Sequence, residues 1–577
     1  ILKNALESIG DGMALTVVRT SRSTVVRQAL DYSTGVLSST GELIGQGFCL
    51  PIHLGGMMPA LKACTDYYQE NINPGDIFML NDPYEGGSHL PDIFLFKPVF
   101  LQDRVVAYLC AMTHHTDIGG RVAGGNACDS SEIYQEGIRI PPVKLYPNGI
   151  PNETVYRLLE KAVRVPEMVM GDLQAQIAGL EYGETQYLEL VSQYGIEPLE
   201  QQVDELIRYT EILTRQAISQ MPNGTWSFSD YIDDDGFGTD SIRITATVKK
   251  ENDELSVDFS GTSPQCNGAI QPVLATTHAV VYAVIKCLLG PQIPNTSGYF
   301  KPVHISAPEG TFVNPVLPAP VAARTLGLVR IANTLFGAFA QMLPQKVYAA
   351  CAGAELGVAI SGYTKSYIPW KPWVLLDFAV EPGMGGFSYR DGLDAVSAGM
   401  LNGANTPVEI LEIDHPVKIL EYEFVPDSEG PGKYRGGMGM KRKYQCVVDE
   451  TTIQVRSDRS KVAPYGLWGG GSSKPTSITA VKNGHFQVKP TKFLDTFSAG
   501  DILEIHWPGG GGWGNPLERN PDQVAEDILH EKISPSRAKL IYGVMFKDGN
   551  TSVDWQSTME LRSKISKVPT ESKGAQR

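Results

Sequence analysis

The chain has 577 residues, which is too long for one hydrophobic core, so we expect roughly two to four packed units. Its composition is that of an ordinary globular protein, and no stretch is long and apolar enough to cross a membrane. The formal net charge of −15 repels polyphosphate backbones, and the Lys and Arg residues are scattered, which excludes a nucleic-acid-binding protein.

The predicted elements change in type along the chain. Residues 1–150 hold short β-type runs between turns rich in Gly, Asp, Asn and Pro, and residues 151–222 turn to a helical period that predicts two or three helices. Residues 223–400 mix strands with helices, residues 401–517 return to strands, and residues 518–577 hold one amphipathic helix and a polar tail. The pattern predicts a multi-domain α+β, or mixed α/β, fold with a β-rich N-terminal metal-binding region, central helices and a β-rich C-terminal region.

The cysteines and the N-terminal residues bear on the compartment. The eight cysteines include no Cys-x-x-Cys pair, which indicates reduced thiols in the core rather than a zinc ribbon or a disulfide framework. Residues 1–9 alternate charged and apolar side chains and lack the basic-then-apolar order of a signal peptide. We therefore expect a soluble protein of the cytoplasm.

Two further polar features invite a functional interpretation, and we interpret both as turns. The glycine clusters at 436–437, 469–471 and 509–512 lack the Gly-x-x-x-x-Gly-Lys-Ser/Thr pattern of a phosphate-binding loop, so we predict tight β turns. The run Asp233-Asp-Asp-Gly236 lacks the spacing of a calcium-binding loop, and we predict a solvated turn.

Two polar turns at the ends of apolar strands carry the sharpest functional signal. Residues 81–92 read Asn-Asp-Pro-Tyr-Glu-Gly-Gly-Ser-His-Leu-Pro-Asp, and residues 113–120 read Thr-His-His-Thr-Asp-Ile-Gly-Gly. If the strands at 93–100 and 104–113 form a hairpin that turns at residues 102–103, Asp92 lies opposite His114, and His89 sits in the adjoining loop. One hairpin therefore brings the imidazoles and carboxylates of both turns together.

Imidazole and carboxylate together are the donor set of a borderline divalent ion. We predict one divalent transition metal, zinc in the first place with manganese or iron as alternatives, rather than calcium or a thiolate site. Such an ion lowers the pKa of bound water and polarises a carbonyl, so that a protein without an activated serine or cysteine can hydrolyse an amide. The alternative is that these residues cap strand ends, which the convergence of several histidines and acids disfavours.

Short polar motifs of different sequence occur along the whole chain. They are Leu30-Asp-Tyr-Ser33, Pro51-Ile-His-Leu-Gly55, Asn81-Asp-Pro-Tyr84, Gly87-Ser-His-Leu-Pro-Asp92, His114-His-Thr-Asp-Ile-Gly-Gly120, Glu136-Gly-Ile138, Val257-Asp-Phe-Ser-Gly-Thr262, Val321-Ala-Ala-Arg324, Asn405-Thr-Pro-Val-Glu409, Asp427-Ser-Glu-Gly-Pro-Gly-Lys-Tyr-Arg-Gly-Gly437 and Pro508-Gly-Gly-Gly-Gly-Trp-Gly-Asn-Pro516. The set resembles the hydantoinase B/oxoprolinase family over almost the whole chain.

The resemblance implies the metal-bearing subunit of an ATP-dependent hydrolase that opens a cyclic amide such as a lactam, a hydantoin or 5-oxoproline. A hydantoinase A-type partner subunit would bind ATP and phosphorylate the substrate, and metal-bound water in this chain would attack the activated carbonyl carbon. We expect a heterotetramer with two subunits of each kind. The lack of a phosphate-binding loop in the sequence agrees with ATP bound by the partner.

The resemblance also assigns site residues. By motif position the metal ligands fall on Asp31, His89, Asp92 and His114. Asp31 rests on the Leu-Asp-Tyr-Ser motif alone. His115 and Asp117 are candidates for proton transfer, with orientation of the ligands or structural hydrogen bonding as the alternatives.

Two more residues and two more functions stay open. Arg324 is a candidate clamp for an anion, with a buried ion pair as the alternative, and His53 either approaches the metal or is a satisfied core histidine. The same metal site would serve an ATP-dependent ketone carboxylase, which bicarbonate dependence would reveal. A non-catalytic scaffold subunit with a structural metal is the third hypothesis, which mixed His and Asp ligation disfavours.

Overall fold

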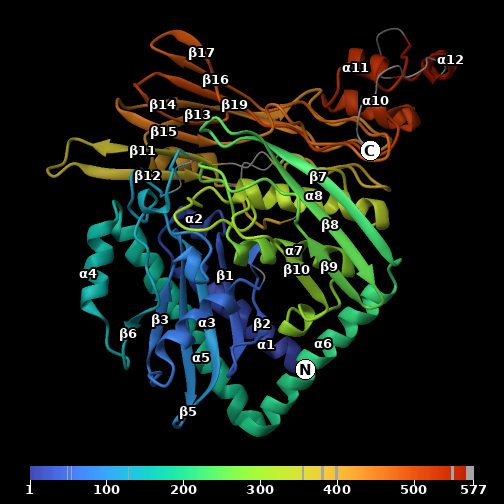
Figure 1. Ribbon diagram of the computed structural model, residues 1–577. Coiled ribbons are helices and arrows are strands. Elements are labelled where there is room, and N and C mark those ends of the chain that lie inside the picture. The colour runs from blue at the N-terminus through green and yellow to red at the C-terminus, as the bar shows by residue number, and fades with distance from the viewer. Residues whose placement is uncertain are drawn as a thin grey trace.

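The computed structural model describes most of the chain. The described residues are 1–577 without Cys49, Leu54, Asn126, Cys128, 354–356, 379–381, 397–399, 548–551 and 567–577, so most of the expected polar tail lies outside them. None of the helices in the described part combines the length and the apolar character that a bilayer crossing requires. The elements alternate between sheets and helical layers, which confirms the mixed α/β fold (Figure 1).

The N-terminal sheet has six strands in the order β2-β1-β5-β4-β3-β6, and all neighbours are antiparallel. Its strands are β1 (Tyr32–Ser38), β2 (Leu43–Gln46), β3 (Ile77–Leu80), β4 (Asp92–Leu101), β5 (Arg104–His114) and β6 (Val143–Tyr146). The helices of this part are α1 (Leu2–Thr20), α2 (Thr24–Arg27) and α3 (Met57–Tyr68), with 3-10 turns η1 (Pro51–His53), η2 (Pro83–Glu85) and η3 (Ile133–Gln135).

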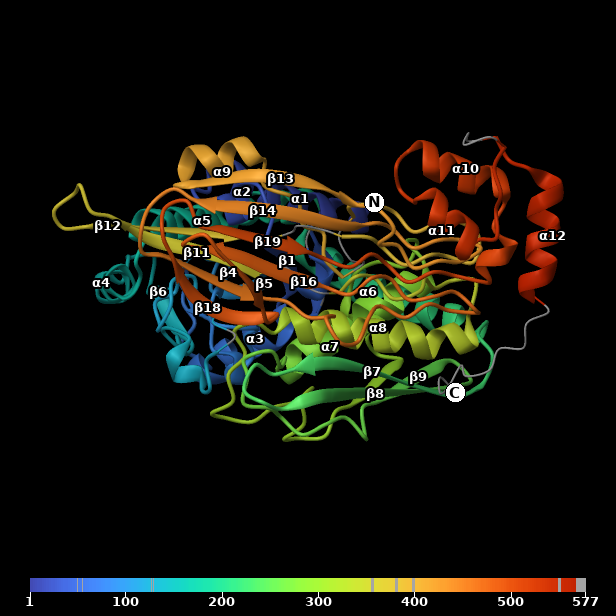
Figure 2. The same ribbon diagram turned by 90° about the horizontal axis from the view of Figure 1, so that it is seen from above.

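Helices and a second sheet follow. The region 151–222 folds into three helices, which confirms the predicted helical stretch: α4 (Glu153–Ala162), α5 (Pro166–Tyr194) and α6 (Ile196–Ser219). The second sheet has the order β10-β9-β8-β7, and its strands are β7 (Gly224–Asp234), β8 (Asp240–Glu251), β9 (Glu254–Asp258) and β10 (Val303–Ser306). Helices α7 (Leu274–Leu289) and α8 (Thr325–Met342) pack between the two sheets, and Figure 2 shows α8 alongside β7. The 3-10 turn η4 (Ser297–Tyr299) precedes β10.

Both faces of the N-terminal sheet are buried, which explains its continuous apolar runs. In β4, Ile93 and Leu95 face a core that includes α1 and α5, whereas Phe94 and Phe96 face a core that includes α3, α7 and α8. The period of two along a strand sends neighbouring side chains to opposite faces. The ends of β4 and β5 are therefore held by packing from both sides.

The C-terminal part contains two packed antiparallel sheets that share one core. The first has the order β12-β11-β15-β18, with β11 (Gly357–Thr364), β12 (Lys371–Asp377), β15 (Thr451–Arg456) and β18 (Lys492–Phe497). The second has the order β13-β14-β19-β16-β17, with β13 (Val417–Val425), β14 (Gly439–Cys446), β16 (Ser477–Lys482), β17 (His485–Lys489) and β19 (Ile502–His506). The remaining elements are α9 (Val408–Asp414), η5 (Pro516–Glu518), α10 (Pro521–Leu529), α11 (Pro535–Leu540) and α12 (Trp555–Ser566).

The structure corrects three expectations. The glycine clusters at 436–437 and 509–512 are close contacts between backbone segments rather than simple β turns: a Cβ on Gly436 would lie 1.9 Å from the carbonyl oxygen of Gly510, and one on Gly511 would lie 1.9 Å from that of Tyr465. The cluster at 469–471 does begin in a turn, in which the amide of Gly470 donates to the carbonyl of Leu467 at 2.9 Å. Region 518–577 contains three short helices among its described residues rather than one, and non-helical segments separate them.

The acidic run at 233–236 is the third correction. Asp233 and Asp235 are buried, not solvated. Asp233 accepts hydrogen bonds from the backbone amides of Ser460, Lys461 and Val462, which lie more than 220 residues away in sequence. A carboxylate with several N–H donors is stable inside a protein, and the sequence gives no local sign of such distant donors.

Candidate metal centre

The β4–β5 hairpin forms where the sequence predicts it, with a one-residue register irregularity between Val99 and Phe100. The two strands turn at Gln102 and Asp103, and Asp92 is the register partner of His114. At the end of the hairpin opposite its turn, the backbone amide of His114 donates to the carbonyl of Asp31 at 3.1 Å. The motif that contains Asp31 is thereby joined to the hairpin by β1, which pairs with β5.

The loop that carries His89 is held by the side chain of Asn81. Its Nδ2 donates to the carbonyl of Leu90 at 2.7 Å, and its Oδ1 accepts from the amide of Ile140 at 2.7 Å. The amide of Asp92 in turn donates to the carbonyl of His89 at 3.0 Å. These bonds satisfy the polar backbone of a buried turn and hold in place the backbone from which the His89 side chain extends.

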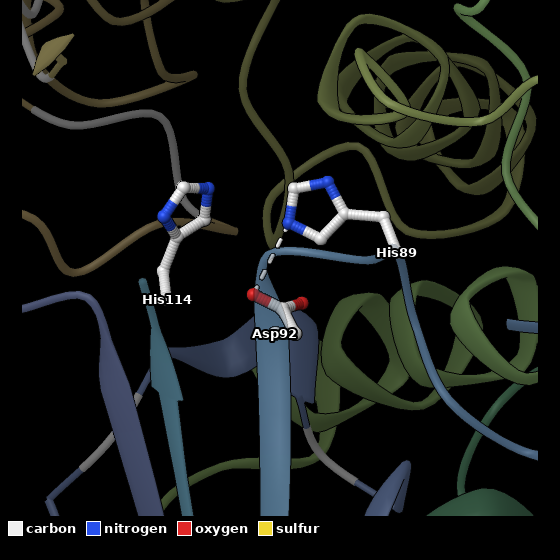
Figure 3. Close-up of side chains that lie close together, drawn as sticks. All are labelled: His89, Asp92 and His114. Atoms are coloured by element: carbon white, nitrogen blue, oxygen red, sulfur yellow. Dashed lines mark hydrogen bonds and ion pairs between the residues drawn. The ribbon is translucent and has the colours of Figure 1, made fainter. Parts of the chain in front are cut away.

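Three donor side chains converge at this end of the sheet. One donor atom each from His89, Asp92 and His114 all lie within 4.8 Å of one another, and all three residues are buried. Figure 3 shows the two imidazoles and the carboxylate meeting above the ends of β4 and β5. The sequence-predicted ligands other than Asp31 are thus brought together by the fold.

The hydrogen bonds of His89 indicate whether a cation can bind between His89, Asp92 and His114. Its Nδ1 lies 2.8 Å from the carbonyl oxygen of Ala322, and since a carbonyl only accepts, Nδ1 carries the proton. In the neutral ring Nε2 then has a bare lone pair, and it lies 3.1 Å from the carboxylate Oδ1 of Asp92. A proton or a metal ion between the two atoms makes this contact favourable, and the donor set of imidazole and carboxylate fits a bound metal ion.

The electrostatics of the cluster favour the same occupant. Burial lowers the pKa of His89, and Arg324 lowers it further. Burial also holds the pKa of His114 well below its ordinary value. Burial by itself would raise the pKa of Asp92, but Arg324 and His89 hold it well below its ordinary value. Neutral imidazoles beside an ionised carboxylate are the protonation states in which these side chains bind metal.

Arg324 forms the buried ion pair rather than standing free as an anion clamp. Its Nη2 pairs with Oδ2 of Asp92, and its Nε donates to the hydroxyl of Ser88 at 2.6 Å. Arg324 and Asp92 are 3% and 0% exposed, so water screens this pair very little. The guanidinium therefore keeps one carboxylate oxygen occupied while Oδ1 faces the imidazoles.

Asp31 lies beside the cluster but outside its closest group. Within the described residues, the group of donor atoms within 4.8 Å contains no atom of Asp31. Burial raises the pKa of Asp31 to about 7, Asp92 also raises it, and Arg324 and Arg456 lower it. The carboxyl group therefore senses the charges of the site.

His115 and Asp117 are not part of the closest group of donor atoms and make other contacts. The Nε2 of His115 donates to Oε1 of Gln176 on α5 at 3.1 Å, because the amide nitrogen of Gln176 already donates to two strand carbonyls. Asp117 accepts from the amides of Gly124 and Arg164 at 2.8 and 2.6 Å and pairs with the Arg164 guanidinium. These contacts favour the orienting alternative for both residues.

Residues from other parts of the chain complete the surroundings. His53 is buried, its Nδ1 shares a 2.8 Å hydrogen bond with the Ser33 hydroxyl, and burial lowers its pKa to about 3. The ring of Phe378 packs edge-on against the imidazole of His114, with 5.3 Å between the ring centroids. The guanidinium carbon of Arg456 lies 4.9 Å from the centroid of the Phe378 ring. The sequence did not single out Phe378 and Arg456, because they come from the C-terminal part and no local pattern near the hairpin indicates them.

Comparisons with known proteins agree with the motifs. A family model described as hydantoinase B/oxoprolinase matches residues 1–516. The chain is 32% identical to a putative D-/L-hydantoinase subunit from Pseudomonas sp. (strain NS671) over 97% of each chain. It is 31% identical to the caprolactamase beta subunit of Pseudomonas jessenii over 98% of each chain.

Two solved structures share the fold. The crystal structure of ATP-dependent caprolactamase from Pseudomonas jessenii matches with a TM-score of 0.91 at 30% identity and covers 97% of this chain and 98% of that one. The nucleotide-free structure of an acetone carboxylase matches with a TM-score of 0.92 over 98% and 83% of the two chains, and its 21% identity shows likeness of fold alone. The chain belongs to the hydantoinase B/oxoprolinase family.

Proposed function

We propose that this chain is the metal-bearing subunit of an ATP-dependent hydrolase that opens cyclic amides such as lactams, hydantoins or 5-oxoproline. The observation that carries the proposal is the buried convergence of His89, Asp92 and His114, with the bare Nε2 of His89 facing a carboxylate oxygen. The relatives named as a caprolactamase subunit and a hydantoinase subunit support a cyclic amide as the substrate class.

The proposed ligands of one divalent transition metal are Asp31, His89, Asp92 and His114. Zinc is our first choice, with manganese or iron as alternatives, because two imidazoles and carboxylates suit borderline ions. When bound, such an ion supplies Lewis-acid chemistry, which activates water and polarises a carbonyl group.

The residues of the chain contribute fixed geometry and charge. His89 keeps its proton on Nδ1 because the carbonyl of Ala322 accepts a hydrogen bond from it. Nε2 is therefore the nitrogen that would bind the metal. Arg324 keeps Asp92 ionised and orients its Oδ1. We propose that His115 and Asp117 position the end of β5 and the following loop rather than transfer protons, because Nε2 of His115 is bonded to Gln176 and Asp117 is paired with Arg164.

ATP use is assigned to a partner. The sequence contains no phosphate-binding loop motif, and two relatives are named as subunits. We propose a hydantoinase A-type partner that binds ATP and phosphorylates the substrate, in a heterotetramer of two subunits of each kind. The phosphorylated amide would then be hydrolysed in this chain.

The deciding experiment is metal content by elemental analysis of wild type and His89→Ala, with ATP-dependent hydrolysis of caprolactam, 5-oxoproline and N-methylhydantoin in the presence of the partner subunit. We expect about one metal per chain in wild type and loss of both metal and turnover in the variant. His506→Ala is the control, because His506 lies on β19 and pairs with Glu504 away from the cluster.

The other outcomes separate the alternatives. Bicarbonate-dependent turnover of a ketone, without amide hydrolysis, would replace the hydrolase by a carboxylase. A metal-free wild type, or a His89→Ala protein that loses metal and keeps turnover, would leave a scaffold subunit instead.

A further inference from the structure

Glu136 is a buried carboxylate that the proposed mechanism does not use. It follows η3 and is 1% exposed. Its Oε1 accepts hydrogen bonds from two successive backbone amides, those of Val321 at 2.8 Å and Ala322 at 2.9 Å. Its Oε2 is buried and has no hydrogen-bond partner among the described residues. The carboxylate is therefore held by one backbone segment 185 residues away in sequence.

The segment that Glu136 holds supports two of the proposed ligands. The carbonyl of Ala322, on the peptide group next to the held amides, accepts from Nδ1 of His89 at 2.8 Å. Two residues further on, Arg324 pairs with Asp92. Segment 321–324 thus sets the ring orientation of His89 and the rotation of the Asp92 carboxylate, and the Glu136 carboxylate is the side-chain acceptor that both amides share.

We propose that Glu136 is a positioning residue for the metal centre: it fixes segment 321–324, and the segment in turn aims Nε2 of His89 and Oδ1 of Asp92 at one point. The inference rests on the proposed function, because it assumes that these atoms bind metal. A group that orients a metal-bound imidazole typically changes metal affinity by about 10–100-fold when it is removed. Here the carboxylate acts through one intervening peptide instead of touching the ring.

The test compares three variants. Glu136→Leu removes both acceptors at similar volume and leaves two buried amides unpaired. Glu136→Gln keeps an oxygen that both amides can reach. Glu429→Leu is the matched control, because Glu429 is also a buried glutamate, and one of its oxygens likewise has no hydrogen-bond partner in the described part of the chain. Its other oxygen holds Arg537 and Tyr542 beside the C-terminal helices.

The measurement is zinc affinity by chelator competition, together with the visible spectrum of the cobalt(II)-loaded protein, neither of which requires turnover. We expect Glu136→Leu to bind zinc about 10–100-fold more weakly and to shift the cobalt spectrum. Glu136→Gln should stay near wild type, and Glu429→Leu should lose thermal stability while its zinc affinity and cobalt spectrum remain unchanged.

Each other result overturns the inference in a recognisable way. If Glu136→Leu and Glu429→Leu lose stability alike and both keep wild-type zinc affinity, Glu136 is a structural residue only. If wild type binds no metal, the proposed metal centre fails and the inference falls with it. Where Glu136→Leu does not fold, Glu136→Asp replaces it, and an unchanged zinc affinity in that variant likewise overturns the proposal.

Discussion

At the scale of single residues, the metal centre depends on which polar atoms of His89, Asp92 and Arg324 contact one another. His89 has its proton held on one side by a carbonyl, so its other nitrogen meets the Asp92 carboxylate as a second acceptor. Arg324 compensates the charge of Asp92 from the opposite side. Without a metal, this arginine is the cationic side chain among the described residues that pairs with the Asp92 carboxylate, and the stability of that state depends on it.

Arg324→Met tests this dependence. The substitution leaves Asp92 buried without its cation, and breaking such a pair costs about 3–5 kcal/mol. We expect a loss of this size in denaturant unfolding with a chelator present, and a larger stabilisation by added zinc than in wild type, because the metal replaces the missing charge.

Arg121→Met is the comparison, since Arg121 pairs with Asp129 at the surface, where such pairs contribute at most about 1 kcal/mol. If zinc stabilises Arg324→Met no more than it stabilises wild type, Arg324 does not compensate the charge of Asp92 in the absence of metal.

At the scale of elements, helix α1 is held close to the N-terminal sheet by glycines. Gly10 lies on the buried face of α1, and a Cβ there would lie 2.5 Å from the backbone nitrogen of Gly47, just beyond β2. Gly47 meets Gly10 in the same way, so the two backbones touch. This contact sets the depth at which α1 packs beside β1, the strand that follows Asp31.

Gly10→Ala should therefore destabilise the protein although alanine favours a helix. The added methyl group meets rigid backbone, and overpacking of this kind costs about 1–3 kcal/mol. Thermal unfolding measures the loss. Ser8→Ala, at an exposed position of the same helix, should change the stability little. Equal melting temperatures for Gly10→Ala and Ser8→Ala would show that α1 shifts freely on the sheet.

At the scale of the whole molecule, a buried ionic network joins the middle of the chain to the C-terminal sheets. Arg330 on α8 pairs with Asp458 at 2.6 Å, and Asp230 on β7 pairs with Arg459 at 3.1 Å. Lys492 on β18 lies 3.3 Å from Asp458. All these side chains are nearly or fully buried. The C-terminal sheets, which bring Phe378 and Arg456 to the metal centre, are thereby tied to α8, which begins directly after Arg324.

Asp458→Asn should weaken this connection in a pH-dependent way. Burial raises the pKa of Asp458, but Lys492 and Arg330 bring it below its ordinary value of 3.8. A carboxylate with a lowered folded-state pKa stabilises the protein above the unfolded value and loses this effect as the pH falls through the folded value.

We expect a deficit of about 3–5 kcal/mol at pH 7 that shrinks below about pH 4. Denaturant unfolding of wild type and variant across this range measures the difference. A deficit that stays constant with pH would show that packing, not charge, accounts for the loss.

The local geometry of the site could be predicted from the amino-acid sequence. The hairpin spacing brought Asp92 and His114 together to within one residue. The turn pairs Leu101 with Arg104, which by itself would set Asp92 opposite Thr113, and a one-residue irregularity between Val99 and Phe100 shifts the partner to His114. Hydrophobic period and motif order likewise predicted the helical stretch and the family. These properties depend on neighbours a few residues away, which a single sequence displays.

The partners of the buried polar groups, in contrast, are known only from the folded chain. Glu136 meets the amides of segment 321–324, Arg324 meets Asp92, and Asp233 meets the amides beyond residue 459, across separations of 185, 232 and 227 residues. The prediction of a solvated Asp233 run was wrong for this reason. A buried charge needs a partner, but nothing in the local sequence states which distant segment the fold will bring to it.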